Sequence, residues 1–307
     1  MKNIILLLFL LLLVSCETYE IHEEGASLEE LNIDIQAHRG GMGLMPENTI
    51  EAMIKAIDLG ATTLEFDLQM SKDSMLVVCH DRYMNSDIIL KPDGSEIEKS
   101  QEGTYLLSEM PYDSIAQYII GLKYWDSYPL QKKISCKIPL LTTLIDTVEA
   151  YTKKIGRDPI DYSIEIKHDA MRDLSEQNEY IDLIMKVLAE KKLGDRVTIQ
   201  SFQSSILNYL HEQYPAIRLS YIITEGLEKS MSRLNFVPDV ISPTHLIVDS
   251  QFMTDASSFG MDVVVWPVDV DKDIKRLILL DVDGIITNYP NWAIKSVCEM
   301  DSLLRNN

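Results

Sequence analysis

The sequence predicts an α/β fold, and a TIM (β/α)8 barrel is the form that best fits its length. Short apolar runs alternate with helix-length amphipathic stretches over about 250 residues, as in a parallel sheet with crossover helices. Several runs, such as 263–266 and 284–287, lack polar alternation, which is typical of strands buried on both faces. A doubly wound open sheet is the alternative, but no Gly-x-Gly-x-x-Gly motif or P-loop stands where that fold would bind a nucleotide.

The expected elements follow one another along the chain from residue 33. The strand at 33–37 is followed by Pro46-Glu47-Asn48-Thr49, a helix start signal, and Gly60 ends the first helix. We expect strands at residues 33–37, 62–68, 75–79, 161–166, 196–200, 217–222, 239–242, 262–266 and 284–287. We expect helices at residues 49–59, 142–155, 180–192, 204–214, 252–259, 272–280 and 292–304. Residues 33–307 should therefore form one barrel domain.

One segment interrupts the alternation. Residues 81–140 are rich in Tyr and Ser and contain the polar turn Lys91-Pro92-Asp93-Gly94. We interpret this segment as a small insertion between two consecutive barrel units, placed between the strands that end at His80 and Glu165.

Composition limits the classes of function. The 307 residues include 28 Lys and Arg against 48 Asp and Glu, a formal net charge of −20. This balance argues against a nucleic-acid partner and against charge-driven docking on anionic lipids, because both need a basic surface. The four Cys are too scattered for a disulfide framework or a zinc ribbon. An acidic globular protein is expected, and its oligomeric state stays open.

The N-terminus has the pattern of an export signal. Lys2 precedes an unbroken apolar run, 4–14, which is too short to span a bilayer and has the proportions of a signal-peptide core. Leu13-Val14-Ser15-Cys16 resembles the lipobox of bacterial lipoproteins, although an ordinary secretory signal is the alternative. That resemblance implies a signal peptide at 1–15, a lipid on Cys16 as the membrane anchor, and a place in the bacterial cell envelope. Residues 16–32, with six Glu and no Lys or Arg, would be an acidic tether.

Ionisable residues gather where the expected strands end. Barrel active sites lie at the C-terminal ends of the strands. The residues that this rule selects are His38, Arg39, Glu65, Asp67, His80, Asp81, Glu165 and Lys167. Each has an ordinary structural interpretation as a rim salt bridge or a satisfied polar group. Their concurrence at four successive strand ends favours a catalytic site, because buried charges are unfavourable unless paired or metal-bound.

These residue types favour phosphodiester chemistry. Three carboxylates, Glu65, Asp67 and Glu165, without thiolates suit one hard divalent cation, either Mg²⁺ or Ca²⁺. Arg39 and Lys167 can complement a phosphoryl group, and two histidines suit acid–base catalysis. Glycoside hydrolysis fits less well, since it needs two carboxylates and no metal.

The motifs resemble the signature of the glycerophosphodiester phosphodiesterase family. The segments that carry the resemblance are His38-Arg39-Gly40, Pro46-Glu47-Asn48-Thr49, Glu65-Phe66-Asp67, His80-Asp81, Ile138-Pro139-Leu140, Glu165-Ile166-Lys167, Gln200-Ser201-Phe202, Val265-Trp266-Pro267-Val268 and residues 283–290. The likeness spans roughly residues 33–295. It implies a TIM barrel that hydrolyses small glycerophosphodiesters to glycerol 3-phosphate and an alcohol. The family often has Trp-Thr-Val-Asn where this chain has Trp266-Pro267-Val268-Asp269.

The resemblance also implies residue roles. His38 and His80 would be the acid–base pair, and the order in which they act stays open. Arg39 and Lys167 would hold the phosphate. The cation would lie on Glu65, Asp67 and Glu165, with Glu47 in support. Trp266 would either line the substrate pocket or pack within the barrel.

Two other functions remain as alternatives. A lysophospholipase D or sphingomyelinase D type of lipid phosphodiesterase could use the same barrel, although residues 91–101 of the insertion are strongly polar. A non-catalytic surface lipoprotein that binds glycerophosphoryl groups is the alternative from another class. A missing histidine or metal-binding carboxylate would favour this non-catalytic alternative, but the motifs contain all of them.

Overall fold

The computed structural model describes residues 32–123, 125–167 and 173–305. The expected signal peptide, Cys16 and nearly all of the expected tether lie outside these ranges. Within the described part of the chain, every helix is too short or too polar to cross a membrane.

Eight parallel strands form a closed barrel, as predicted. Their order around the barrel is β1, β11, β10, β9, β8, β7, β6 and β2, and pairing of β1 with β2 closes the ring. The strands are β1 (Asp34–Ala37), β2 (Thr63–Met70), β6 (Asp161–Ile166), β7 (Val197–Ser201), β8 (Arg218–Ile223), β9 (Val240–Pro243), β10 (Asp262–Val265) and β11 (Gly284–Thr287). Every pairing in the ring is parallel, so all eight C-terminal ends meet at one end of the barrel, here called the mouth. The opposite end is called the bottom.

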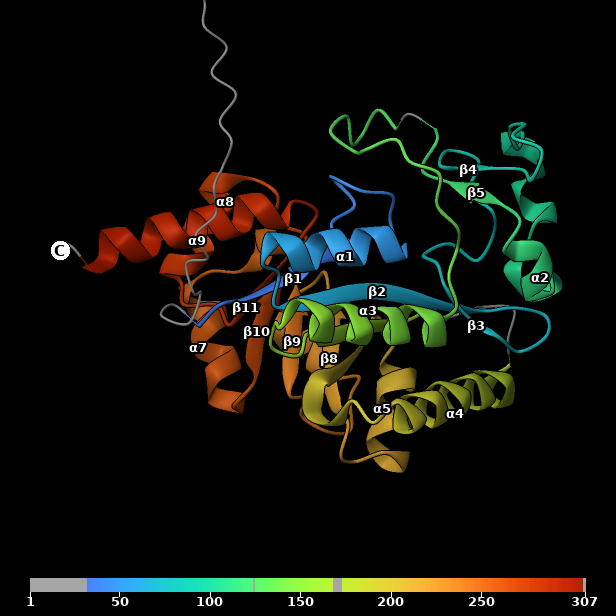
Figure 1. The fold of residues 1–307 in the computed structure, drawn as a ribbon. Coiled ribbons are helices and arrows are strands. Elements are labelled where there is room, and N and C mark those ends of the chain that lie inside the picture. Colours follow the sequence, from blue (N-terminus) through green and yellow to red (C-terminus); the bar gives the residue numbers. More distant parts are fainter. Residues whose placement is uncertain (1–31, 124, 168–172, 306–307) are drawn as a thin grey trace, which may run out of the picture.

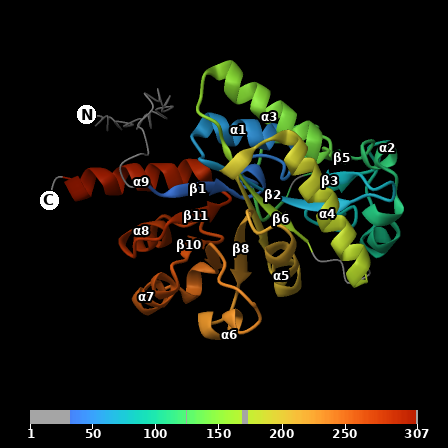
Figure 2. The same cartoon turned by 90° about the horizontal axis from the view of Figure 1, so that it is seen from below.

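Helices surround the strands (Figure 2). They are α1 (Ile50–Leu59), α3 (Leu141–Ile155), α4 (Leu174–Lys191), α5 (Ser204–Gln213), α6 (Leu227–Met231), α7 (Ser250–Phe259), α8 (Asp271–Leu279) and α9 (Pro290–Arg305). Short 3-10 helices are η2 (His38–Gly40), η3 (Lys99–Thr104), η4 (Leu107–Glu109), η5 (Gly194–Arg196) and η6 (His245–Ile247). The expected start of α1 is confirmed, because the Thr49 hydroxyl accepts a hydrogen bond from Ala52 N and Gly60 ends the helix in the left-handed conformation.

The core and the site share one strand. Leu64, Phe66 and Leu68 of β2 are fully buried in the main hydrophobic cluster. Glu65 and Asp67 alternate with them and therefore point to the other face of β2. Burial of the three apolar side chains fixes the register of β2, because a slip of one residue would exchange the two faces. The same packing therefore holds both carboxylates in place.

The third expected strand differs from the prediction. β3 (Leu76–Val78) forms, but it runs antiparallel to the end of β2 and is not a barrel strand. Only a tight turn at 71–75, with Ser74 at φ 59, connects it to β2. A parallel neighbour would need a crossover of a dozen or more residues, so the short connection excludes one. The next barrel strand after β2 is β6.

The chain between β3 and α3 builds a small lobe beside the mouth. It contains the hairpin of β4 (Ile89–Leu90) and β5 (Ile119–Ile120) together with α2 (Tyr112–Ile115). Its apolar side chains, with Val77 and Cys79, form a second hydrophobic cluster. Figure 1 shows this lobe on the side toward which β2 points. The lobe contacts the loop after β1, where Lys132 N donates to Leu44 O at 2.8 Å.

Acidic residues at the bottom bind the backbone of neighbouring strands. Asp239, just before β9, accepts a hydrogen bond from Leu219 N of β8 through Oδ2 at 2.8 Å. Asp283, just before β11, accepts one from Val263 N of β10 in the same way at 2.7 Å. Each carboxylate therefore satisfies a backbone donor near the start of the preceding strand.

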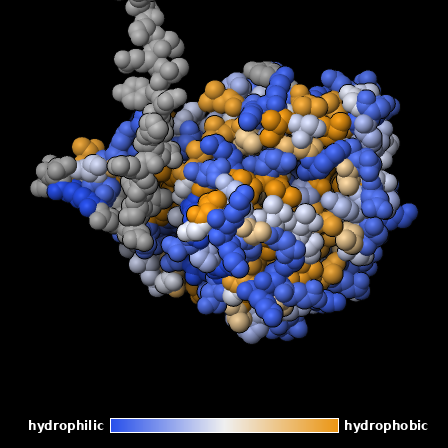
Figure 3. Space-filling model, viewed as in Figure 1, coloured by the Kyte–Doolittle hydropathy of each residue, from blue (hydrophilic) through white to orange (hydrophobic). Residues whose placement is uncertain are grey.

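On the outer surface, hydrophilic and hydrophobic residues are interspersed over the face in Figure 3.

Candidate active site

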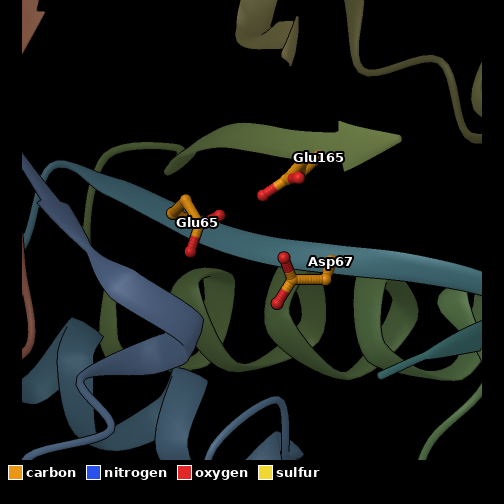
Figure 4. Close-up of side chains that lie close together, drawn as sticks. All are labelled: Glu65, Asp67 and Glu165. Atoms are coloured by element: carbon orange, nitrogen blue, oxygen red, sulfur yellow. The ribbon is translucent and has the colours of Figure 1, made fainter. Parts of the chain in front are cut away.

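Three buried carboxylates meet at the mouth (Figure 4). Glu65 and Asp67 come from β2 and Glu165 from β6, and the parallel register sets Asp67 directly opposite Glu165. One oxygen from each lies within 4.8 Å of the others, and the three residues are 1%, 1% and 7% exposed. The close grouping that the strand-end rule predicted is therefore present.

The three carboxyl groups differ in acidity. Burial, reinforced by the charge of Asp67, holds the pKa of Glu65 well above its usual range. Burial likewise raises the pKa of Glu165 to about 7, against the opposing effect of Lys167. Burial would also raise the pKa of Asp67, but Lys167 and Arg39 hold it well below its usual range. Because burial disfavours the charged forms of Glu65 and Glu165, a bound cation would favour the ionised carboxylates and lower both pKa values.

Two cations flank the carboxylates. Lys167 Nζ lies 2.9 Å from Asp67 Oδ1 and 2.8 Å from Glu165 Oε1. Arg39 Nε lies 3.4 Å from Asp67 Oδ2, and its NH1 donates to Glu47 Oε1 at 3.1 Å. Burial opposes both charges, but the surrounding acids raise the pKa values of Lys167 and Arg39 above their usual range. Both side chains are therefore positively charged beside the cluster.

The donor set fits a hard divalent cation. Asp67 Oδ1 is buried and makes no hydrogen bond within the described chain, although Lys167 pairs with it electrostatically. The Asp67 Oδ1 oxygen is therefore available as a metal ligand. Mg²⁺ and Ca²⁺ prefer oxygen ligands, and three carboxylate oxygens converge at this point. Glu47 lies against Arg39 instead of joining this set of three.

A strained turn places Arg39. The residue has φ 50, in the left-handed region that non-glycine residues rarely adopt. In this conformation Arg39 N donates to Glu65 Oε2 at 2.8 Å. Gly40 follows at φ 79, and a Cβ there would lie 2.7 Å from the Cβ of Ala52. The sequence His38-Arg39-Gly40 therefore brings a backbone donor and a guanidinium to the same carboxylates.

The two histidines approach the cluster from different elements. His38 follows β1, and its Nε2 lies 4.0 Å from Glu65 Oε2. Burial lowers the pKa of His38 to about 3, with the charge of Arg39 acting in the same direction, so the imidazole is neutral. His80 follows β3, and its Nδ1 lies 3.0 Å from Asp81 Oδ1. A hairpin strand thus delivers the second histidine that a barrel strand was expected to carry.

Trp266 lies at the mouth end of β10. Its Nε1 donates to Ser242 O at 2.8 Å, and its ring meets that of Phe202 edge to face at a centroid distance of 5.2 Å. The ring is partly exposed, and Phe202 is 39% exposed. The pair can offer apolar surface to a ligand in the mouth, and the roles of Trp266 as pocket and as packing residue are both compatible with these contacts.

Sequence reasoning assigned no role to several polar residues at the same site. Gln200 Nε2 donates to Glu65 Oε1 at 2.9 Å, and Asn48 Nδ2 donates to Asp67 Oδ2 at 2.9 Å. Asn288 Oδ1 lies 2.6 Å from His38 Nδ1, and Asp269 in turn contacts Asn288. Gln200 and Asn288 stand at the ends of β7 and β11, so extending the strand-end rule to amides would have selected them.

The sequence and the fold both match known proteins. A family model described as the glycerophosphoryl diester phosphodiesterase family matches residues 38–292. The chain is 26% identical over 262 residues to the glycerophosphodiester phosphodiesterase of Caldanaerobacter subterraneus, covering 85% of this chain and 96% of the relative. It is 22% identical over 287 residues to the lysophospholipase D GDPD1 of Rattus norvegicus, covering 83% and 82%.

Solved structures share the fold. A protein of Silicibacter pomeroyi assigned as a glycerophosphoryl diester phosphodiesterase superposes with a TM-score of 0.79 at 24% identity, over 87% of this chain and 94% of that one. An Oleispira antarctica phosphodiesterase, solved with the product sn-glycerol-3-phosphate, gives a TM-score of 0.68 at 20% identity, over 89% and 100%. With most of the chain matched by the family model, this protein belongs to the glycerophosphoryl diester phosphodiesterase family and is a phosphoric diester hydrolase.

Proposed function

We propose that the protein hydrolyses small glycerophosphodiesters to glycerol 3-phosphate and an alcohol with the help of one divalent cation. The observation that carries this proposal is the buried set of Glu65, Asp67 and Glu165 with Arg39 and Lys167 beside it. The Oleispira antarctica relative bound to sn-glycerol-3-phosphate supports the choice of substrate class.

The side chains divide the work between binding and proton transfer. Glu65, Asp67 and Glu165 would hold the cation, which supplies charge stabilisation to the phosphoryl oxygens. Arg39 and Lys167 would bind the phosphodiester through charge-assisted hydrogen bonds. His38 and His80 would exchange protons with the attacking and departing oxygens. Glu47 would keep Arg39 in place, because it accepts two hydrogen bonds from NH1.

A substrate panel tests the proposal. Purified protein is assayed with glycerophosphocholine, glycerophosphoethanolamine and glycerophosphoglycerol in the presence of Mg²⁺, Ca²⁺ or EDTA. We expect release of glycerol 3-phosphate with at least one cation and none with EDTA. Full turnover in EDTA would overturn the metal assignment, and binding of the diesters without turnover by calorimetry would favour the non-catalytic alternative.

The histidine roles have their own test. His38→Ala and His80→Ala should each lower kcat by about 10²-fold or more, since positioned acid–base catalysis contributes 10²–10⁴-fold. His211→Ala is the matched control, because His211 stacks on Phe236 at a centroid distance of 4.1 Å away from the site. Near-normal turnover in both site variants would overturn the assignment.

Lipid substrates form a second candidate. Exposed apolar side chains follow three strands at the mouth: Phe202 after β7, Leu246 after β9 and Val270 after β10. Such a rim could accept an acyl chain, and the rat relative is named a lysophospholipase D. Comparing lysophosphatidylcholine with glycerophosphocholine decides between the two, with the deacylated substrate expected to be preferred because the lobe at 91–101 is strongly polar.

We also propose that the mature chain begins at Cys16 and carries its lipid there. The support is the Leu13-Val14-Ser15-Cys16 sequence alone. Metabolic labelling with a palmitate analogue in a bacterial host should label the wild-type chain and not Cys16→Ser. Equal labelling of both would overturn the proposed anchor.

A further inference from the structure

A chain of contacts at the seam of the barrel leads away from His38. His38 Nδ1 lies 2.6 Å from Asn288 Oδ1, just after β11. Asn288 Nδ2 donates to Asp269 Oδ2 at 2.5 Å and to the Tyr128 hydroxyl at 3.3 Å. Asn288 is 3% exposed, so its amide has to find its partners within the protein.

These contacts define which way the Asn288 amide points. The other oxygen of Asp269, Oδ1, accepts hydrogen bonds from Asn288 N at 2.8 Å and from the Thr287 hydroxyl at 3.0 Å. The carboxylate therefore acts only as an acceptor, and a donor has to face it from the Asn288 side chain. A flipped amide would bring two oxygens to 2.5 Å. The amide oxygen must consequently face His38.

The orientation of the amide has a consequence for the imidazole. A carbonyl oxygen can only accept, so the hydrogen bond requires the proton of neutral His38 to be on Nδ1. The remaining nitrogen, Nε2, then has a free lone pair. It is this nitrogen that lies 4.0 Å from Glu65 Oε2, on the side of the carboxylate cluster.

We propose that Asp269 and Asn288 are positioning residues that hold His38 in the Nδ1-protonated tautomer, so that Nε2 enters the reaction as the base. The inference rests on the proposed phosphodiesterase function and assigns an order to its two histidines. His38 Nε2 takes the proton of the attacking hydroxyl, and His80 gives a proton to the departing alkoxide. Neither Asp269 nor Asn288 needs to touch the substrate.

The tautomer can be measured without any assay of activity. In uniformly ¹⁵N-labelled protein with Mg²⁺, long-range ¹H–¹⁵N correlations distinguish a protonated Nδ1 from a protonated Nε2, and His38→Ala identifies the signals. We expect the wild-type His38 to carry its proton on Nδ1. A proton on Nε2 would overturn the inference while leaving the proposed reaction intact.

Exchanging the two side chains tests the coupling. In Asp269→Asn, an amide faces an amide, and Asn288 is expected to turn its NH2 toward His38 and favour the Nε2-protonated tautomer. We expect kcat to fall by about 10²-fold, since a histidine held in the wrong tautomer loses its role as base. KM should change little, because Arg39 and Lys167 are untouched.

The double variant Asp269→Asn/Asn288→Asp restores the pattern in reverse. Asn at 269 can keep its oxygen on the backbone N–H of residue 288 and donate its NH2 to Asp at 288, whose other oxygen accepts from His38. We expect the Nδ1-protonated tautomer to return and kcat to recover to within about threefold of wild type. Tyr128→Phe is the matched control, since it removes only the 3.3 Å contact and should have a much smaller effect.

Three further results would overturn the inference. These are an unchanged tautomer in Asp269→Asn, equal kcat losses in the single and double variants with folding intact by circular dichroism, and a Tyr128→Phe loss as large as that of Asp269→Asn. If the wild type hydrolyses no diester, the tautomer measurement still decides the positioning claim, so the two failures can be told apart.

Discussion

Carboxylates lie at both ends of the barrel strands, but they have different neighbours. At the bottom, Asp239 and Asp283 each accept a hydrogen bond from a backbone N–H of the adjacent strand. At the mouth, Glu65, Asp67 and Glu165 converge within 4.8 Å and are held by side chains of opposite charge. The bottom acids satisfy backbone donors of the strands, whereas burial at the mouth raises the pKa values of Glu65 and Glu165 and the cations Lys167 and Arg39 lower that of Asp67.

The comparison shows what separates a stabilising acid from a functional one. Position is the first difference, because the bottom acids stand just before a strand whereas the mouth acids lie within β2 and β6. The second is the group that opposes the effect of burial on the pKa: at Asp283 it is the backbone N–H of Val263, whereas at Glu165 it is the ammonium of Lys167, 2.8 Å away, and the pKa of Glu165 is still raised to about 7. A buried carboxyl group with a raised pKa beside a cation is typical of a ligand-binding or catalytic site.

The largest expected effect comes from neutralising a mouth carboxylate. Glu65→Gln should lower the hydrolysis rate by about 10³-fold or more, because it removes a cation ligand worth several kcal/mol of charge stabilisation. Its free energy of unfolding in EDTA should stay close to that of the wild type, because the substitution keeps the shape of the side chain. Asp239→Asn at the bottom is the matched control and should keep wild-type kcat. Equal losses of rate in Glu65→Gln and Asp239→Asn would contradict the assignment of catalysis to the mouth and of stability to the bottom.

Cation binding should stabilise the mouth measurably. At a free Mg²⁺ or Ca²⁺ concentration a hundredfold above Kd, the free energy of unfolding should rise by about 2.7 kcal/mol, seen as a higher Tm. Because the pKa of Glu165 is raised to about 7, binding releases a proton below that pH, and affinity should increase as pH rises through 7. A Tm shift that persists in Glu65→Gln would mean that the cation binds elsewhere.

A smaller effect is expected from removing a bottom carboxylate. Asp239→Ala leaves the backbone N–H of Leu219 without its acceptor, and Leu219 is only 2% exposed. The free energy of unfolding should fall by about 1–2 kcal/mol in urea titrations, while kcat stays within twofold of wild type. A large fall in kcat at unchanged stability would show that the bottom also serves catalysis.

The smallest effect concerns pH and the bottom ion pair of Glu149 and Arg196. The hydrogen bond from Arg196 is the main cause that lowers the pKa of Glu149 below its usual 4.5. The pair therefore stabilises the fold above pH 4.5 and loses this contribution as pH falls through the lowered pKa. Glu149→Gln should reduce the free energy of unfolding by less than about 1 kcal/mol at pH 7, because both side chains are partly exposed and solvent screens the pair, and by less still at pH 3. A loss of unfolding free energy in Glu149→Gln that grows toward low pH would contradict the predicted pH dependence.

Most of the barrel could be predicted because its signals are local. Short apolar runs located the eight barrel strands, and residues at or just after the expected ends of β1, β2 and β6 gave Arg39, Asp67 and Lys167. The same rule placed His80 at the mouth for the wrong reason, since β3 is antiparallel. The five residues between β2 and β3 were the available signal, because no parallel crossover fits in so short a connection.

The rest depends on contacts between distant parts of the chain. The hairpin of β4 and β5 has two residues in each strand, which leaves no periodic pattern to recognise. The Asn288 amide gains its direction from Asp269, which comes from a different strand end, and it also contacts Tyr128 of the lobe. A sequence shows which groups can form hydrogen bonds, but packing across the seam decides which nitrogen of His38 carries the proton.

The hydrogen bond between His38 and Asn288 joins residues 250 positions apart. It exists only when β11 has docked beside β1, the pairing that opposes Ala37 to Thr287. During synthesis at about 5–20 residues per second, all three carboxylates, both cations and both histidines leave the ribosome well before the amide that orients the base. Full turnover would therefore require that the last strand has closed the ring, which makes kcat a reporter of the final step of folding.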